Sequence, residues 1–417
     1  MSRTTLACLL AQTPVVVTGA GAVSAAGDSV QALWNAVAAG RVPAVRREFT
    51  RPGRVQTFTV CPAPTLDPAR PPMHPVRRMD RCAQLAWHAA LDARVSAGLE
   101  AGPDQRRIGV MLGTSRGPLA KLQDGFARLE DRRYPPSLSA DCTLGSLSGV
   151  LAQGLKAQGP TATVAATCAS GAFAIALAAE QIVLGNADVM LAGGAEAPLI
   201  PAILAQLDAV GVLGSHDDPA RTCRPFDVTR NGLCLGEGSG FLVLESAEHA
   251  QRRNAAVRAR LSGWALGVDG SGRAGLDPTG AGLVDLLGDA LATAALDADA
   301  IHAVNTHGTG TQLNDLVEAR ALRACLGPRA SDVPCSATKP VTGHCLGATP
   351  ALEAIVCIES LRHQIVPPTA NCRQLDPRCP IHIPHSAVQV KELRHVLSSS
   401  LGFWGYQAAL IFSSPSA

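Results

Sequence analysis

The sequence of 417 residues predicts an α/β protein built around a large core, and three observations lead to that prediction. Short runs of β-branched and aliphatic residues, typical of buried strands, alternate with segments whose apolar residues recur at helical spacing. Hydrophobic residues make up 47% of the chain and charged residues only 17%, against about 25% in ordinary soluble domains. No low-complexity linker or run of like charges separates these segments, so we expect a soluble globular protein.

The expected elements alternate from the N-terminus onward. Strands are expected at 15–19, 107–114, 188–196, 240–245, 301–308, 333–339, 395–402 and 408–413, and helices at 30–39, 81–97, 170–184 and 350–361. This alternation is typical of layered α/β folds. The proline-rich stretch 62–75 is expected to be a surface loop. Residues 379–385, CPIHIPH, lack a second pair of ligands, so we expect a loop there and not a metal site.

Charge and composition argue against several classes of function. The 36 basic and 34 acidic residues leave a net charge of +2, and aromatic residues are only 3% of the chain, so nothing predicts nucleic-acid binding. No apolar stretch reaches the roughly 18 residues of a membrane span, and residues 1–13 have too short an apolar run for a signal peptide. Thirteen cysteines without Cys-x-x-Cys pairs indicate reduced thiols. The expected location is the cytoplasm.

A cysteine stands where a predicted strand meets a predicted helix. In TVAATCASGAFAIALAAEQI, residues 163–182, β-branched residues lead to Cys168, and small residues follow before the apolar helical pattern begins. Unsatisfied N–H groups and the positive end of a helix dipole favour a thiolate at such a position, which would make Cys168 a nucleophile. The alternative is a buried structural cysteine, because free cysteine is among the most buried residue types. This stretch alone leaves both interpretations open.

Two histidines and a lysine lie on strand-end loops in the second half of the chain. His307 lies in NTHGTGTQLND, just past a predicted strand, and Lys339 and His344 lie in ATKPVTGHCLGAT, which opens onto the helix expected at 350–361. Each histidine alone is most often a loop or core residue. Together with a nucleophilic cysteine they would suit an acyl-thioester reaction, which needs a thiolate, donors for an oxyanion and an imidazole.

Five ordered motifs resemble those of the β-ketoacyl-acyl carrier protein synthases, or ketosynthases. They are TCASG around Cys168, CRPFDVTRNGLCLGEGSGFLVLE at 223–245, THGTGTQLND, TKPVTGHCLGA and SLGFWG. The resemblance covers nearly the whole chain, and five ordered motifs are far more specific than one. It implies the thiolase fold, with two similar α/β halves, residues 1–258 and 259–417, in a five-layered αβαβα arrangement.

The resemblance also implies the catalytic roles. Cys168 would carry the acyl chain as a thioester, and His307 and His344 would stabilise the enolate formed when a malonyl-carrier thioester loses carbon dioxide. The backbone N–H groups of Cys168 and Phe403 would form the oxyanion hole for the following condensation. The enzyme would be a β-ketoacyl synthase, an acyltransferase that performs a decarboxylative Claisen condensation.

Supporting roles follow from the same resemblance. Lys339 would pair with Glu318 and order the site, while Thr309 and Thr311 would bind the pantetheine arm. No cofactor or metal is expected, because the phosphopantetheine arrives on the acyl carrier protein. That carrier is the expected partner, and its acidic helix would meet the basic pair at 77 and 78. A dimer is expected, either of two identical chains or with a subunit of the chain-length-factor type.

The sequence also departs from the family pattern. The terminal loop reads GFWGYQ where housekeeping members have Gly-Phe-Gly-Gly, which places Trp404 beside Phe403, a residue expected to gate the pocket. Trp404 is therefore expected to bind substrate, and we expect its replacement by glycine to widen the substrate or product range. The central motif has Asn231 where an aspartate is usual, and residues 132–148 lack the pattern expected near the acyl tunnel. These departures favour type II polyketide or polyene synthesis.

Several alternatives stay open at this point. Housekeeping fatty-acid elongation would use the same site, and an acyltransferase could pass the acyl group from Cys168 to an alcohol or amine. A non-catalytic chain-length factor would normally lack the cysteine. A thiolase would need a second catalytic cysteine near the C-terminus, where this chain reads SSSLGFWGYQAALIF.

Overall fold

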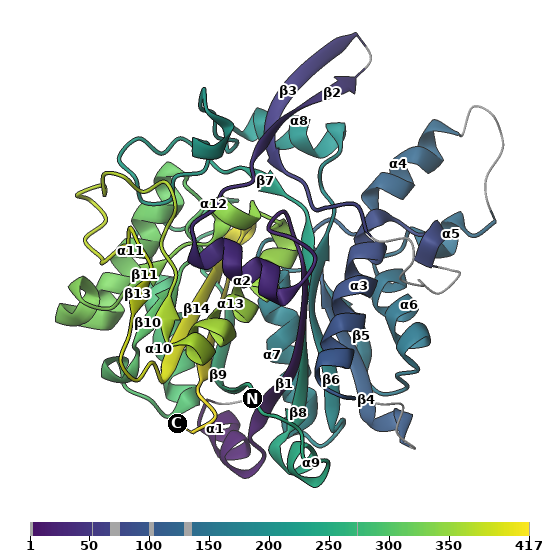
Figure 1. Ribbon diagram of the computed structural model, residues 1–417, viewed down its shortest axis with the longest axis vertical. Coiled ribbons are helices and arrows are strands. Elements are labelled where there is room, and N and C mark those ends of the chain that lie inside the picture. Colours follow the sequence, from purple (N-terminus) through teal and green to yellow (C-terminus); the bar gives the residue numbers. More distant parts are fainter. Residues whose placement is uncertain are drawn as a thin grey trace.

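The computed structural model describes residues 3–51, 53–66, 76–99, 104–128, 136–272 and 274–416. These residues form an α/β fold whose main feature is a continuous ten-stranded sheet. From one edge to the other the strands run β11-β10-β14-β15-β9-β1-β8-β6-β4-β5. Figure 1 shows the strands running through the molecule with helices on either side and between them.

Each half of the chain contributes five of these strands. The first half gives β1 (Val15–Val23), β4 (Ile108–Gly113), β5 (Thr161–Val164), β6 (Val189–Glu196) and β8 (Gly238–Ser246). The second gives β9 (Ala259–Val268), β10 (Ala303–Asn305), β11 (Cys335–Ser336), β14 (His395–Leu401) and β15 (Tyr406–Ser413). The halves join where β1 pairs with β9 over three residue pairs.

The two halves have the same topology. If the five strands of each half are numbered along the chain, the order outward from the central β1–β9 pair is 1-5-4-2-3 in both. In each half the second strand pairs in parallel with the third and the fourth. The carboxyl ends of these parallel strands therefore point to one edge of each half, which is where α/β proteins place their sites.

Helices complete a five-layered αβαβα arrangement. Two of them, α7 (Ser170–Val183) and α13 (Thr349–His363), lie between the halves and contact strands of both. On the outer face of the first half lie α3 (Arg81–Ser96) and α6 (Gly145–Leu155), and on that of the second lie α10 (Ala281–Ala294) and α11 (Gln312–Leu326). The expected thiolase fold is confirmed.

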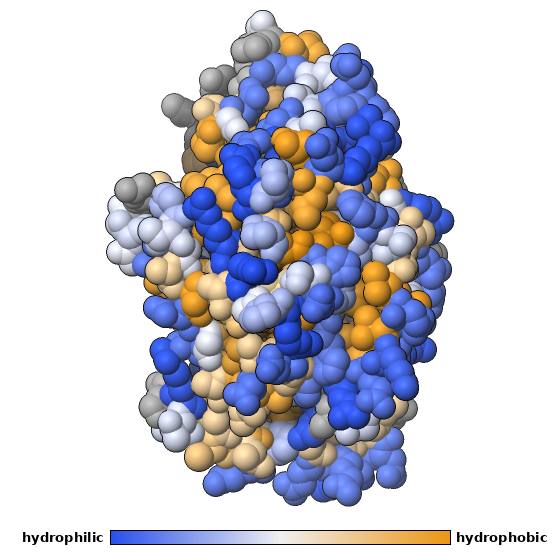
Figure 2. Space-filling model, turned by 90° about the vertical axis from the view of Figure 1, so that its left-hand side faces the viewer, coloured by the Kyte–Doolittle hydropathy of each residue, from blue (hydrophilic) through white to orange (hydrophobic). Residues whose placement is uncertain are grey.

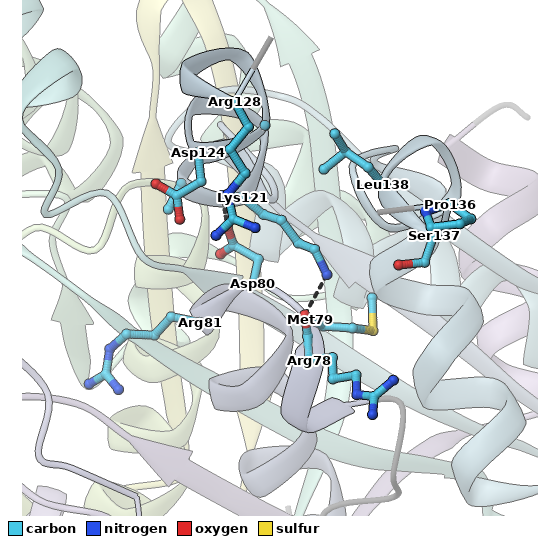
Figure 3. Close-up of a pocket in the computed structure, with 12 residues that line it drawn as sticks. Arg78, Met79, Asp80, Arg81, Lys121, Asp124, Arg128, Pro136, Ser137 and Leu138 are labelled. Atoms are coloured by element: carbon cyan, nitrogen blue, oxygen red, sulfur yellow. Dashed lines mark hydrogen bonds between the residues drawn. The ribbon is translucent and has the colours of Figure 1, made fainter. Parts of the chain in front are cut away.

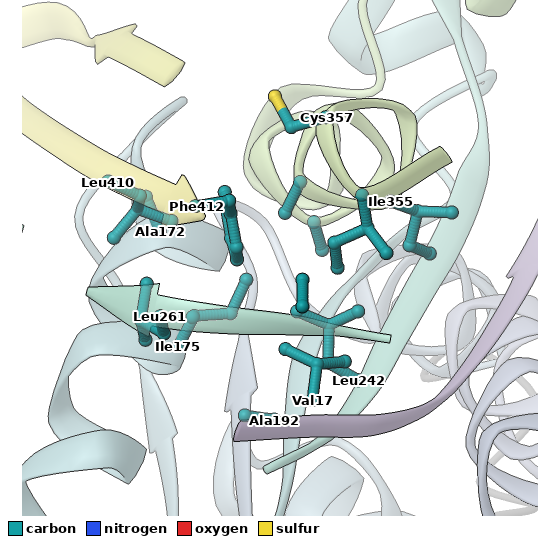
Figure 4. Close-up of a cluster of buried hydrophobic side chains, with 14 of the residues drawn as sticks. Val17, Ala172, Ile175, Ala192, Leu242, Leu261, Ile355, Cys357, Leu410 and Phe412 are labelled. Atoms are coloured by element: carbon teal, nitrogen blue, oxygen red, sulfur yellow. The ribbon is translucent and has the colours of Figure 1, made fainter. Parts of the chain in front are cut away.

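The main core cluster surrounds the two central helices. Both α7 and α13 are mostly apolar and are buried over most of their surface, although α13 also buries Glu353 and Glu359. Figure 4 shows Ala172 and Ile175 of α7 and Ile355 of α13 among strand residues of both halves, such as Leu242 of β8 and Phe412 of β15. The small residues of α7 bring the two halves close together around the loop that carries Cys168.

The remaining elements lie outside the ten-stranded sheet and the six helices named above. The hairpin of β2 (Val45–Arg51) and β3 (Arg54–Cys61) projects from the top of Figure 1, and β3 pairs with β7 (Leu235–Gly236). The short strands β12 (Ile365–Val366) and β13 (Val388–Gln389) form a two-stranded sheet. The other helices are α1 (Arg3–Gln12), α2 (Val30–Ala38), α4 (Leu119–Ala127), α5 (Leu138–Asp141), α8 (Pro201–Val210), α9 (Ala247–Arg252) and α12 (Lys339–Thr342).

Several expectations about loops and surfaces can be compared with the structure. Residues 379–385 form irregular structure, and the described residues contain no cluster of three or more potential metal ligands. In the proline-rich stretch, residues 62–66 have no regular structure and 67–75 lie outside the described residues. No described helix is long and apolar enough to cross a membrane. Figure 2 shows hydrophobic patches between hydrophilic residues on one face.

Candidate active site

A cavity of about 260 Å³ lies where loops of the two halves meet. Cys168 from the first half and His307 and His344 from the second all line it. The other lining residues are mainly apolar and include Leu207, Leu233, Leu276, Leu346, Leu401 and Phe403, with Thr309, Thr311 and Asn314 as polar neighbours. The structure thus gathers residues separated by up to 235 positions in one small apolar space.

Cys168 lies in a tight turn between β5 and α7. Thr167 has φ of +50°, a conformation that is unfavourable for a β-branched residue and common at functional sites. Ser170 fixes this turn: its Oγ accepts a hydrogen bond from Ala166 N at 2.9 Å and donates to Thr114 O at 3.1 Å. The turn therefore holds the thiol at the start of the helix, as the sequence predicts.

The thiol is protonated at rest. Burial raises the pKa of Cys168 to about 12, and the positive charges of Lys339 and Arg116 lower it only in part. The helix terminus and the nearby cations favour the thiolate, but they offset only part of the loss of solvation. The proton must leave Cys168 during acylation.

The rings of the two histidines are in edge-to-face contact at the cavity wall. Their ring centroids are 5.4 Å apart and their planes are nearly perpendicular, at 84°. Burial and the charge of Lys339 lower the pKa of both histidines well below the usual value, so both imidazoles are neutral at pH 7. A neutral imidazole has one N–H donor. His344 Nδ1 lies 3.1 Å from Thr349 Oγ1, whereas His307 Nδ1 has no hydrogen-bond partner among the described residues.

Lys339 is paired with Glu353, and the expected pair with Glu318 is not formed. Lys339 Nζ lies 2.7 Å from Glu353 Oε1 and also donates to the backbone oxygen of His307. Glu318 instead accepts hydrogen bonds from His307 N at 2.6 Å, Gly308 N at 2.8 Å and Ser399 Oγ at 2.5 Å. Both carboxylates hold the histidine loop, one directly and the other through Lys339. The only sequence signal for Glu353 was an acidic residue in an otherwise apolar helical segment.

The loop after His307 is shaped by a buried aspartate. Asp315 accepts hydrogen bonds from Thr309 N at 3.1 Å and Gly310 N at 3.2 Å, and Gly310 has φ of +78°, which a residue with a side chain rarely adopts. Thr309 Oγ1 and Thr311 Oγ1 lie 2.9 Å apart at the cavity wall. Two hydroxyls are thus presented side by side at one wall.

The central motif supports the same loop. Arg230 is fully buried, pairs with Asp376 at 2.6 Å and donates to the backbone oxygen of Thr311 at 3.1 Å. Asn231 bridges Ser215 and Arg224, since its Nδ2 donates to Ser215 O at 3.0 Å and its Oδ1 accepts from Arg224 Nη2 at 3.0 Å. An aspartate could not make that donation, so this departure from the family pattern has a structural consequence.

The terminal loop lies directly against the nucleophile. A Cβ atom on Gly402 would lie 2.0 Å from Thr167 Oγ1 and 3.1 Å from Cys168 N, so only glycine fits this contact. Phe403 lines the cavity, but Trp404 does not: its side chain is 63% exposed and its backbone has φ of +62°. The indole of Trp404 therefore lies at the surface, outside the cavity, because the tight turn directs it there.

The fold and the site together define a condensing enzyme, and the chain belongs to the β-ketoacyl synthase family. Residues 12–250 match the N-terminal domain of that family and residues 258–373 its C-terminal domain. The chain is 37% identical to a putative polyketide β-ketoacyl synthase 1 of Streptomyces halstedii, over 96% of this chain and 98% of the relative. It is a ketosynthase and hence an acyltransferase.

Solved structures of similar fold include complexes. One is a type II polyketide synthase acyl carrier protein in complex with its ketosynthase bound to the hexaketide. The matched chain has a TM-score of 0.88 and 27% sequence identity, and the match covers 96% of this chain and 99% of that one. Another is the ishigamide ketosynthase/chain length factor, with a TM-score of 0.87, 30% identity and the same two coverages.

Proposed function

We propose that this ketosynthase catalyses decarboxylative condensation of an acyl group on Cys168 with a malonyl-carrier thioester, in type II polyketide synthesis. The observation that carries the proposal is the meeting of one buried thiol and two neutral imidazoles in an apolar cavity. The polyketide assignment is supported by the relative from Streptomyces halstedii, which is named a putative polyketide β-ketoacyl synthase.

The first half-reaction is a thioester exchange. The Cys168 sulfur attacks the acyl carbonyl of the incoming thioester and the bond to the pantetheine sulfur breaks. The thiol proton passes to the departing pantetheine sulfur, so that acyl-S-carrier and Cys168-SH become acyl-S-Cys168 and HS-carrier. Burial raises the pKa of Cys168 to about 12, so the thiol must lose its proton in the course of this step. The backbone N–H groups of Cys168 and Phe403 would stabilise the oxyanion, and the contact of Gly402 with Cys168 N favours this role.

The second half-reaction forms the carbon–carbon bond. The malonyl group loses carbon dioxide, and the electron pair of the broken bond forms an enolate whose oxygen accepts hydrogen bonds from His307 and His344. Neutral donors in an apolar cavity stabilise such a charge better than the same donors would in water. The enolate carbon then attacks the acyl carbonyl and Cys168 leaves as a thiolate that regains a proton. This chemistry requires no metal or cofactor of the enzyme, and Thr309 and Thr311 would hold the pantetheine arm.

A basic cleft is the proposed contact for the carrier protein. It is lined by Arg78, Arg81, Lys121 and Arg128 together with Asp80 and Asp124 (Figure 3). Arg81 is paired with Glu237 at 2.8 Å and Lys121 with Asp141 at 2.7 Å, whereas Arg78 is exposed. The side chain of Arg77 lies outside the described residues. Arg78 is thus a candidate contact for the acidic helix of an acyl carrier protein, and charge reversal there should raise the Michaelis constant for carrier-bound substrate.

The proposed subunit contact is the edge strand β5. It ends the ten-stranded series and pairs only with β4 among the described strands, and its first two residues are exposed. An unpaired edge is a template for a further strand. The second solved structure is a ketosynthase with a chain length factor, so the partner would be either such a subunit or a second copy of this chain. Sedimentation of the chain alone and with a chain length factor separates these cases, and an active monomer would contradict both.

Product analysis tests the function. Purified enzyme is incubated with acyl- and malonyl-carrier proteins, and the products on the carrier are identified by mass spectrometry. A β-ketoacyl product with release of carbon dioxide supports the proposal. Loading of Cys168 without decarboxylation would favour transfer to an alcohol or amine. Fully reduced saturated products in the presence of the housekeeping reductases would favour fatty-acid elongation.

A further inference from the structure

A second cavity, of about 240 Å³, lies at the end of the sheet far from Cys168. It is enclosed by α1, the end of α10 and the ends of β9, β14 and β15, and we call it the α1 cavity. The strand β14 begins there and ends at the terminal loop beside Cys168, so its seven residues separate the two cavities by roughly 20 Å. Within the described residues the two cavities share no lining residue. Figure 1 shows α1 at the bottom of the view, with the hairpin of β2 and β3 at the top.

The helix α1 closes this cavity on one side. Its Ala7 and Leu10 line the cavity, and the helix packs against α10. An ion pair of 2.5 Å between Arg3 Nη2 and Asp289 Oδ2 ties α1 to α10. The match to the β-ketoacyl synthase family begins at residue 12, the last residue of α1, so the family assignment gives this cavity no role.

The strands place three polar side chains on the face of the sheet that α10 covers. Ile411 of β15 packs in the same core cluster as Leu287 of α10, and side chains alternate along a strand, so Ser413 points to that face as well. His395 and Arg260 lie directly opposite Ser413 on the neighbouring strands. Directly opposed residues share a face, so all three side chains point toward the layer that holds α1 and α10.

A chain of hydrogen bonds joins two hydroxyls to the imidazole of His395. Ser262 Oγ donates to Ser413 Oγ at 2.7 Å, and Ser413 Oγ lies 2.7 Å from His395 Nδ1. The Ser413 hydroxyl, which is 2% exposed, can then donate to Nδ1, and a neutral imidazole carries its proton on Nε2. Burial and the positive charges of His302 and Arg394 lower the pKa of His395, so the ring is neutral at pH 7. His395 therefore keeps one N–H donor beyond this chain.

The lining of the α1 cavity is basic at one side and apolar at the other. Arg260 and His395 belong to it, and no acidic residue is among its described lining residues. Leu10 of α1 and Leu296 after α10 supply apolar surface. A cavity of 240 Å³ equals the liquid volume of roughly eight water molecules, so it has room for about eight non-hydrogen atoms. Pockets that combine apolar walls with a few convergent polar groups are typical small-molecule sites.

We propose that the α1 cavity binds a short amphipathic carboxylate of about six carbons, as its volume allows. The carboxylate would lie toward Arg260 and His395, because a guanidinium holds a carboxylate through two parallel hydrogen bonds. The alkyl tail would lie against Leu10 and Leu296. This site is separate from the condensation at Cys168 and goes beyond the proposed function, since no step of that reaction uses the residues of the α1 cavity.

Calorimetric titration of the full chain tests this inference. The probes are hexanoate, 1-hexanol without the carboxylate, acetate without the tail, and inorganic phosphate as a different anion. Arg260→Gln removes the charge, and Ala7→Phe fills the cavity without removing a polar group. The matched controls are Arg323→Gln in α11 and Cys8→Phe in α1, since both residues are exposed and neither lines the cavity.

We expect the wild type to bind hexanoate with a Kd of about 1 mM or tighter, and at least about 10-fold more tightly than the other three probes. Arg260→Gln and Ala7→Phe should weaken hexanoate binding by about 10- to 100-fold, the cost of losing a hydrogen bond to a charged group, whereas both controls should bind as the wild type does. No hexanoate binding, equal affinity for 1-hexanol, or tighter binding of phosphate would each overturn the inference. Hexanoate bound only in the Cys168 cavity would survive both variants and would overturn it as well. If Ala7→Phe does not fold, Arg260→Gln alone decides.

Discussion

Replacement of His307 by alanine should separate the two half-reactions. The side chain is buried at the cavity wall, and its Nδ1 has no hydrogen-bond partner among the described residues. The hydrogen bonds that hold this position are made by the backbone, which donates to Glu318 and accepts from Lys339, so they survive the substitution. The variant should therefore fold and lose mainly one donor to the enolate.

The size of the effect follows from the character of that donor. Loss of one preorganised oxyanion donor costs about 100- to 1,000-fold in rate, or roughly 2.7–4 kcal/mol. We expect His307→Ala to acylate Cys168 at a near-normal rate and to release carbon dioxide from malonyl-carrier protein at least 100-fold more slowly, in keeping with that cost. Cys168→Ala should do the reverse, with no acylation and retained decarboxylation.

The assay follows two signals in the same reaction: the mass of the Cys168 peptide and the carbon dioxide released. His302→Ala is the matched control, because His302 lies at the other end of β10, outside the cavity lining. Full condensation by His307→Ala would refute the assigned role. Acylation of any of the other twelve cysteines in place of Cys168 would refute the assigned nucleophile.

Three further predictions test the surroundings of the site. Lys339→Met leaves Glu353 buried without its partner and should lower the free energy of unfolding by about 3–5 kcal/mol, measured by urea denaturation. The double variant Lys339→Met with Glu353→Leu should regain part of that lost free energy. Burial raises the pKa of Glu196 to about 7, so the folded state binds a proton more tightly than the unfolded state does. The contribution of Glu196 to the free energy of unfolding should therefore fall as the pH rises from about 4.5 to 7. Glu196→Gln should flatten that decline, and an identical pH profile would contradict the raised pKa. Trp404→Gly should leave Cys168 acylation and product length unchanged, because the indole lies outside the cavity and glycine suits φ of +62°. Longer products detected by mass spectrometry would instead show that the indole closes on the substrate.

Periodicity predicted the elements that carry the site, because they are buried and strongly patterned. The helix expected at 170–184 is α7, and the strands expected at 188–196 and 395–402 are β6 and β14 within a residue or two. The hairpin of β2 and β3 was missed, although VRREFTRPGRVQTFTVC has a Pro-Gly turn between two β-rich runs. Its pattern is weaker because much of it is exposed.

Electrostatic partners were harder to predict than positions. Cys168, His307 and His344 were placed correctly at one cavity, since strand-end loops converge. The ion pair of Lys339 in α12 with Glu353 in α13 depends on the packing of these two helices, and no local sequence pattern reports that packing. The predicted pair with Glu318 was therefore wrong. The pKa of Cys168 depends on its depth of burial, which no sequence pattern reports, whereas its place at a helix start can be read from the sequence.

The repeated strand order has a consequence for how such a site can diversify. Cys168 follows the third strand of the first half, and Lys339 and His344 follow the third strand of the second, so equivalent loops of the two halves meet at the site. One half supplies the nucleophile and the other supplies the imidazole. The two loops hold equivalent places in the topology but are separate segments of the chain, so a substitution in one can change the surroundings of the thiol while the other keeps its histidine.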